Sequence, residues 1–282
     1  MSNAFKTTVL LALLTGLLMW VGQFLGGPQG LVVGLVLAAM MNLGSYWFSD
    51  RIVLSMYGAR PLSEEQAPDL FRVVRELAMG AHMPMPRVYL IANDSPNAFA
   101  TGRSPEHAAV AVTEGILRLL SLDELRGVLA HELSHVHNRD TLISAIAATL
   151  AGVVMMAARM AQFAALFGGM RRDEREEGPG PLGFLAMVIL APLAASLIQL
   201  AISRAREYEA DATGARLSHA PQALAAALEK IAVQSGRLPL AAGPATAHLW
   251  IVNPLRGNWL ASLFSTHPPI AERVRRLRAM AY

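Results

Sequence analysis

Two long apolar stretches without a charged residue stand near the start of the chain, and they constrain its fold more than any other feature. The first covers residues 7–25 and the second covers 31–48, with the turn-forming residues 26–30 between them. Each is about 20 residues long, the length of a helix that crosses a bilayer. Tyr46 and Trp47 suit the membrane–water interface. The pattern predicts a transmembrane hairpin, because a buried hairpin of a soluble protein would normally carry some charge.

Two further apolar stretches lie in the second half of the chain. Residues 141–167 are interrupted by Arg159 and Gln162, and residues 182–202 contain Pro192. Proline is tolerated inside a membrane helix. These stretches predict a second hairpin and four transmembrane helices in all. The alternative is that this pair packs as a partly embedded hairpin.

Composition supports a membrane protein and excludes several function classes. Charged residues make up 16% of the chain, against roughly 25% in soluble globular proteins. Cysteine is absent, which excludes disulfides and thiol catalysis. The net charge is only +3, with no basic run interleaved with aromatic residues. We therefore expect no nucleic-acid partner.

The distribution of positive charge predicts the orientation of the protein in the membrane. Nine arginines lie within 51–139 and ten lysines and arginines lie within 204–278, whereas the turn at 26–30 has none. The positive-inside rule then places both basic segments in the cytoplasm.

The charged segment 50–140 predicts a small α+β head. An amphipathic helix is expected at 67–79, followed by strands at 87–92, 97–102 and 108–113. Later helices are expected at 222–231 and 270–280.

A five-residue motif supplies the clearest chemical signal. His131-Glu132-Leu133-Ser134-His135 places two histidines four apart, so on an α-helix both face the same way. Two such imidazoles can share one metal ion, and zinc accepts neutral imidazole nitrogen. Glu132 then stands where a carboxylate reaches a water made acidic by the metal. This is the spacing of a zinc peptidase helix, although the motif also occurs by chance in proteins that bind no metal.

The surrounding residues place this motif inside a helix. Ser121 and Glu124 form a potential capping box at its start. An apolar stripe at helical spacing follows, made of Leu122, Leu125, Val128 and Leu129.

A catalytic zinc site usually has three protein ligands, so a third must come from elsewhere. A histidine ten positions after the first is excluded, because residue 141 is threonine. The remaining acidic candidates lie in the loop 173–177 or at Glu207, Glu209 and Asp211. Glu207 and Asp211 are four apart, so Glu207 could bind the metal while Asp211 accepts a hydrogen bond from a ligating histidine. Glu209 would point about 160° away from that face. The alternative is a solvated helix whose charges pair locally.

Three separated segments together resemble the HtpX family of bacterial membrane-bound zinc metalloproteases of the heat-shock response, which are related to the CAAX prenyl endopeptidases. They are the histidine motif with its continuation to Asp140, the segment 203–211, and Ser-Thr-His-Pro-Pro at 265–269. The resemblance covers nearly the whole chain, and the combination of segments is specific although each alone is not. It implies a stress-response protease of the bacterial inner membrane that degrades misfolded or damaged membrane proteins.

The resemblance and the spacing together predict the site. His131, His135 and Glu207 would hold one Zn²⁺ per chain, with Glu132 as the general base. Four further residues are expected to support a ligand or contact the substrate: Asp211, His267, Arg204 and Asn97.

Two of these assignments have a plain alternative. The family places residues 97–102 on a strand edge that pairs with the substrate backbone, but an ordinary interior strand fits the sequence equally well. His267 corresponds to a histidine beside the active site in this family, yet most lone histidines are structural or exposed.

The predicted fold is therefore a mostly helical, α+β multi-pass membrane protein with four transmembrane helices and a gluzincin-like metalloprotease head. It begins with an N-terminal transmembrane hairpin at 1–49, followed by a first part of the head with the zinc helix at 50–140. A second transmembrane hairpin at 141–202 is followed by a second part of the head with the third ligand at 203–282.

Two rival functions remain. An intramembrane protease would place its histidines inside an apolar stretch, whereas charged residues flank this pair. The other rival is a membrane scaffold with an inert motif, which the zinc content of the protein would reveal.

Overall fold

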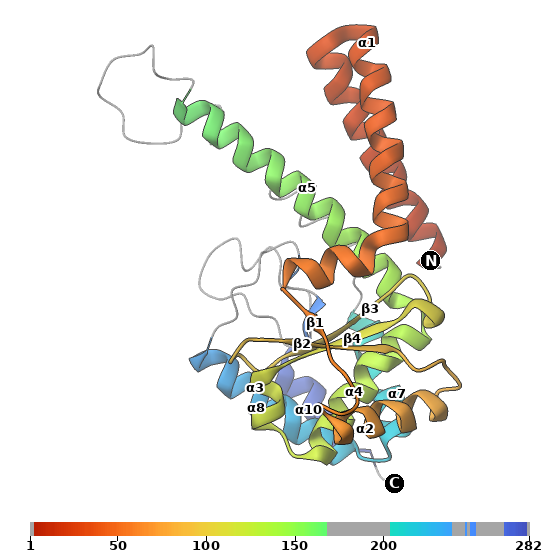
Figure 1. The fold of residues 1–282 in the computed structure, drawn as a ribbon, viewed down its shortest axis with the longest axis vertical. Helices are drawn as coiled ribbons and strands as arrows, with labels where there is room; N and C mark the ends of the chain where they lie inside the picture. The colour runs from red at the N-terminus through yellow and green to blue at the C-terminus, as the bar shows by residue number, and fades with distance from the viewer. Residues whose placement is uncertain (1–2, 168–203, 239–245, 247–248, 252–267, 281–282) are drawn as a thin grey trace.

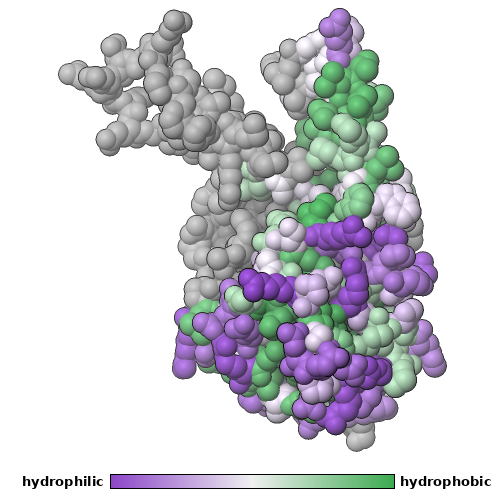
Figure 2. All heavy atoms as spheres, in the orientation of Figure 1, coloured by the Kyte–Doolittle hydropathy of each residue, from purple (hydrophilic) through white to green (hydrophobic). Residues whose placement is uncertain are grey.

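The chain forms a head built around a small sheet, from which two apolar helical segments project on one side (Figure 1). This computed structural model describes residues 3–167, 204–238, 246, 249–251 and 268–280. Hydrophobic side chains cover the projecting α1, whereas the surface of the head is largely hydrophilic (Figure 2).

The first projecting segment, α1 (Asn3–Met56), is a helical hairpin. Its backbone leaves the helical conformation at Gly26 and Gly27, where Gly27 has a φ of 59°. Such a positive φ favours glycine, because a Cβ would be strained there. Pro28 then lies in the first turn of the returning helix, where its missing N–H costs no hydrogen bond. A helical hairpin with its turn at the expected position is therefore confirmed, whereas its crossing of a membrane stays a prediction.

Small residues let the two helices of α1 approach closely. A Cβ built on Gly22 would lie 2.1 Å from the carbonyl oxygen of Gly30, so only glycine fits at this crossing. Nearer the head, Asn42 Nδ2 donates to Thr15 Oγ1 over 2.9 Å. It also donates to the carbonyl of Leu11 over 3.3 Å. Apolar side chains of the hairpin pack against α5 (Asp140–Phe167).

One helix of the described chain is long and apolar enough to cross a membrane. It is the returning half of α1, Gly26–Met56, and the most apolar part of it is only 17% buried. Phe5–Trp20 and Asp140–Gly152 are shorter apolar helices. The expected fourth membrane helix, at 182–202, lies outside the described residues. A crossing by four helices therefore stays a prediction.

The head contains a four-stranded sheet in the order β1-β2-β4-β3. β2 and β4 are parallel, and the two outer pairs are antiparallel. The three predicted strands are confirmed, and a two-residue strand, too short to show a pattern, is added. The strands are β1 (Arg60–Pro61), β2 (Arg87–Ile91), β3 (Ala98–Thr101) and β4 (Ala109–Thr113).

The two faces of the sheet pack against different layers. Val110 and Val112 face a core shared with the helices of the head. Their neighbours Ala109 and Ala111 face the end of α1 and the first turns of α5. This alternation follows from the two-residue period of a strand. The sheet is thus buried between the head helices and the bases of the projecting helices.

The helix α4 (Leu122–His137) lies at the centre of the head and carries the histidine motif. Its predicted capping box is present: Ser121 accepts from the backbone of Glu124, whose side chain accepts from the backbone of Ser121. Val128, Leu129 and Leu133 are fully buried in the core. The other head helices are α2 (Pro68–Gly80), η1 (Pro105–His107), α3 (Glu114–Leu119), α7 (Arg204–Ser218), α8 (Pro221–Arg237) and α10 (Ile270–Arg278).

Candidate metal centre

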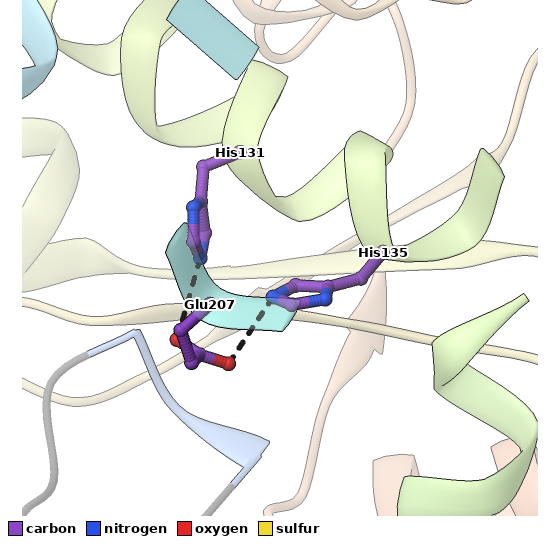
Figure 3. Close-up of side chains that lie close together, drawn as sticks. All are labelled: His131, His135 and Glu207. Atoms are coloured by element: carbon purple, nitrogen blue, oxygen red, sulfur yellow. Dashed lines mark ion pairs between the residues drawn. The ribbon is translucent and has the colours of Figure 1, made fainter. Parts of the chain in front are cut away.

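Two adjacent helices bring three potential metal ligands together (Figure 3). α4 presents His131 and His135 on one face, and α7 points Glu207 between them. His131 Nε2 lies 3.9 Å from Glu207 Oε2, and His135 Nε2 lies 3.5 Å from Glu207 Oε1. One ligand atom from each residue lies within 4.8 Å of the other two. A single ion can therefore be reached by all three.

Close packing of α7 on α4 makes this convergence possible. A Cβ added to Gly214 would lie 2.7 Å from the backbone nitrogen of His131, closer than real side chains approach. Glycine therefore lets the two helices come near enough for Glu207, two turns earlier on α7, to reach the histidines. Glu209 is exposed, as expected for a residue on the opposite face.

A carboxylate lies beside the second nitrogen of each histidine. His131 Nδ1 lies 3.0 Å from Asp211 Oδ1, and His135 Nδ1 lies 3.3 Å from Asp140 Oδ2. Each contact orients the ring so that Nε2 faces Glu207, the arrangement that second partners give to metal-binding histidines. The spacing predicted Asp211, whereas the sequence analysis assigned no role to Asp140.

The charges around this cluster favour a cation. Burial works against the charge on His135, but the hydrogen bond to Asp140 and the charge of Glu207 together raise the pKa of His135 to about 9. The surroundings of His135 thus stabilise a positive charge there, whereas burial and the charge of Arg273 lower the pKa of His131. Two imidazole nitrogens and one carboxylate are a donor set that zinc accepts. The residues present therefore fit a zinc ion.

A buried arginine that the sequence analysis missed completes the centre. Arg273 of α10 is fully buried and donates from Nε and Nη2 to both oxygens of Asp211, over 2.8 and 2.7 Å. Its Nη1 donates to the carbonyl of Ile251 over 3.1 Å and lies 3.9 Å from Glu207. A sequence signal existed: Arg273 shares a helical face with the buried Leu277, where a charged residue is unusual.

Glu132 is held at the edge of the sheet. Its Oε2 accepts from the backbone N–H of Ala100 in β3 over 2.9 Å, and its side chain is buried. Burial raises the pKa of Glu132 to about 8, and a nearby cation would lower it again. A carboxyl with a pKa near neutrality can both accept and return a proton.

The outer edge of β3 is paired at two points with other parts of the chain. Ala98 and Ala100 turn their backbone groups away from β4. The carbonyl of Ala98 accepts from Ile251 N–H over 3.2 Å, and Ala100 N–H is bound by Glu132. Trp250, fully buried, stacks edge-on against Phe99 at 4.9 Å. Chain segments therefore occupy both positions beside the metal cluster.

The remaining predicted residues lie in different surroundings. Asn97 is buried, and its Oδ1 accepts from the N–H of Ala98. Arg204 is exposed at the first turn of α7, with no hydrogen bond or ion pair to the described residues. His267 and the acidic loop at 173–177 lie outside the described residues.

Comparison with known proteins shows which proteins this chain is similar to. The sequence model of peptidase family M48 matches residues 64–281. A "Protease HtpX homolog" of Syntrophobacter fumaroxidans is 63% identical, over 99% of this chain and all of that protein. One of the same name from Pyrococcus furiosus is 55% identical, over 98% of this chain and 95% of that protein.

A solved structure shares the fold. The crystal structure of S. mikatae Ste24p aligns with a TM-score of 0.52 and 18% identity, over 98% of this chain. This chain spans 65% of the length of that one.

Proposed function

Because this chain belongs to the HtpX proteases of peptidase family M48, we propose that it is a zinc-dependent endopeptidase anchored in a membrane. Its family makes it a membrane-associated metalloprotease that acts on proteins. The observation that carries the zinc proposal is the convergence of two helix-borne histidines and a glutamate, with a carboxylate beside each histidine.

We assign the roles of the residues from this geometry. His131, His135 and Glu207 hold one zinc ion per chain. That ion would supply a Lewis acid that polarises the scissile carbonyl and makes a water more acidic. Glu132 accepts the proton of the attacking water and returns it to the nitrogen of the leaving amine. Asp211 and Asp140 keep the two imidazole rings in the orientation that this requires.

The edge of β3 is the part of the head that suits an extended substrate. A peptide that adds to this edge would pair with the backbone of Ala98 and Ala100, in the way that peptides extend exposed sheet edges. The peptide must first replace two hydrogen bonds: the one that Ile251 N–H donates to the carbonyl of Ala98, and the one that Ala100 N–H donates to Glu132. Substrate entry would therefore release the Glu132 carboxylate from Ala100 as the scissile bond arrives.

The biological setting is a further part of the proposal. We infer four membrane crossings in two hairpins, with the head formed by 50–140 and 203–282 in the cytoplasm of a bacterial cell, on the inner membrane. Misfolded or damaged membrane proteins are the substrates that the family resemblance favours. The exposed apolar surface of α1 supports the anchoring.

Metal content tests the ligand assignment with a matched pair of variants. The full-length protein is purified in detergent as wild type, Glu207→Ala and Glu209→Ala, and bound zinc is measured by elemental analysis. We expect one zinc per chain in the wild type and in Glu209→Ala, because Glu209 is exposed. Glu207→Ala should lose most of its zinc. Equal zinc content in both variants would contradict the assignment of Glu207 as a ligand. Failure of the wild type to take up zinc would contradict the proposal that the protein is a zinc-dependent peptidase.

A further inference from the structure

A charged and aromatic pocket lies where the returning helix of α1 enters the head. It has a volume of about 460 Å³. The pocket is lined by Trp47, Phe48, Asp50, Arg51, Arg87, Arg103, Glu106 and His107. In Figure 2, hydrophilic side chains gather directly below the apolar surface of α1.

The position of this pocket along α1 matches the depth of lipid headgroups. From Pro28, the helix rises about 1.5 Å per residue, so Trp47 lies roughly 30 Å from the turn of the hairpin. This distance equals the thickness of the hydrocarbon core of a bilayer. Trp47 and Phe48 are half-exposed, as expected of aromatic side chains at a membrane interface. The guanidiniums beside them would therefore lie among lipid phosphates.

The guanidiniums are held in place by groups that leave their charge available. Arg103 stacks on the ring of Trp47 at 4.7 Å and donates to His107 over 2.6 Å. Arg51 lies over the ring of Phe48 at 5.7 Å. Within the described part of the chain, neither arginine has a carboxylate partner. Aromatic stacking fixes the planes of both guanidiniums without neutralising them.

Among the described residues, a carboxylate pairs with only the third arginine of the pocket. Arg87 pairs with Asp50 over 2.5 Å. With Glu106, the pocket therefore holds three guanidiniums against two carboxylates. The planar guanidinium of arginine can donate two hydrogen bonds to the oxygens of a phosphate. The surplus positive charge of the pocket disfavours zwitterionic lipids, whose headgroups also carry a cation.

We propose that this pocket binds the phosphate group of an anionic phospholipid on the head side of the membrane. Arg51 and Arg103 provide the charge, Trp47 and Phe48 orient them, and the lipid tails lie along the apolar surface of α1. The bound lipid would fix the height of the head above the bilayer. This inference concerns the anchoring of the protein and does not depend on the peptidase chemistry.

Lipid retention by the full-length protein tests the proposal. The detergent-purified protein is titrated with phosphatidylglycerol or phosphatidylcholine, and bound lipids are counted by native mass spectrometry. The test variant is Arg51→Gln/Arg103→Gln. The matched control, Arg72→Gln/Arg275→Gln, removes the same charge from exposed positions on α2 and α10, away from α1.

We expect the wild type and the control to bind phosphatidylglycerol at least tenfold more tightly than phosphatidylcholine. The test variant should lose about 25-fold in phosphatidylglycerol affinity, about fivefold for each guanidinium near a membrane surface. Its unfolding temperature and zinc content should equal those of the control. If the double variant does not fold, each single variant should show a loss of about fivefold.

Three results would overturn the proposal. One is unchanged phosphatidylglycerol binding in the test variant, and another is equal binding of both lipids by the wild type. The third is displacement of phosphatidylglycerol by millimolar inorganic phosphate but not by sodium chloride of equal ionic strength, which would assign the pocket to a soluble anion.

Discussion

Removal of the Arg273 guanidinium should weaken both the fold and the metal site. Arg273 is fully buried and is the bidentate partner of Asp211, which in turn orients His131. Arg273→Met preserves most of the side-chain volume but leaves the Asp211 carboxylate buried without its counter-charge. We expect this change to act on two measurable quantities, the free energy of unfolding and the zinc affinity.

The magnitude follows from the contacts that are lost. Removing one partner of a buried ion pair costs about 3–5 kcal/mol, because the other charge stays desolvated. The loss of orientation at His131 should lower zinc affinity about 10–100-fold. Asp211→Asn removes the carboxylate charge that Arg273→Met leaves buried without a partner. The double variant Arg273→Met/Asp211→Asn should therefore be about 2–3 kcal/mol more stable than the sum of the two single effects predicts.

Chemical denaturation in detergent micelles measures the first quantity, and competition with a zinc chelator measures the second. Arg275→Met is the control: its side chain is 77% exposed on the same helix, so its effect on the free energy of unfolding should stay within about 0.5 kcal/mol. The reasoning would be refuted if Arg273→Met matched this control in both assays. Additive effects in the double variant would refute the coupling between Arg273 and Asp211.

Three further substitutions test other parts of the account. Gly214→Ala should lower the free energy of unfolding by about 1–3 kcal/mol, because its Cβ would overlap the backbone of α4. Its control is Gly152→Ala, where no described atom lies within 4 Å of the added Cβ, and which should change the free energy of unfolding by less than about 1 kcal/mol in denaturation assays. Asp140→Asn should lower zinc affinity about 10–100-fold in chelator competition; unchanged affinity would show that this carboxylate does not support His135. Gly22→Leu should separate the two helices of α1 and lower the unfolding temperature, and a neutral effect would contradict their close contact.

Local spacing predicted those parts of the structure that depend on a single helix or strand. The pair His131 and His135 was predictable because four residues make one helical turn, and Ser121 marked where that helix begins. The hairpin of α1 was predictable because its turn requires the backbone freedom of Gly27. In each case the determining residues lie close together in the sequence.

Contacts between distant segments were predictable only in part. Glu207 was identified by its spacing from Asp211, but its approach to the histidines depends on the tight packing at Gly214. Arg273 was missed because the terminal helix looks like a solvated basic helix, with several exposed arginines around the buried one. The pairing of Ile251 with Ala98 had no sequence signal, since a backbone hydrogen bond depends on the course of the chain and not on residue type.

The most direct test of the account separates the general base from the metal ligands. Wild type and Glu132→Gln are purified in detergent, loaded with zinc, and compared for zinc content and for cleavage of an unstructured protein. Glu132 binds the backbone of Ala100 and is not assigned as a ligand. The variant should therefore keep one zinc per chain and lose cleavage by at least about 100-fold, the lower end of the usual contribution of a general base. Equal cleavage by both proteins, or loss of zinc from the variant, would contradict the account.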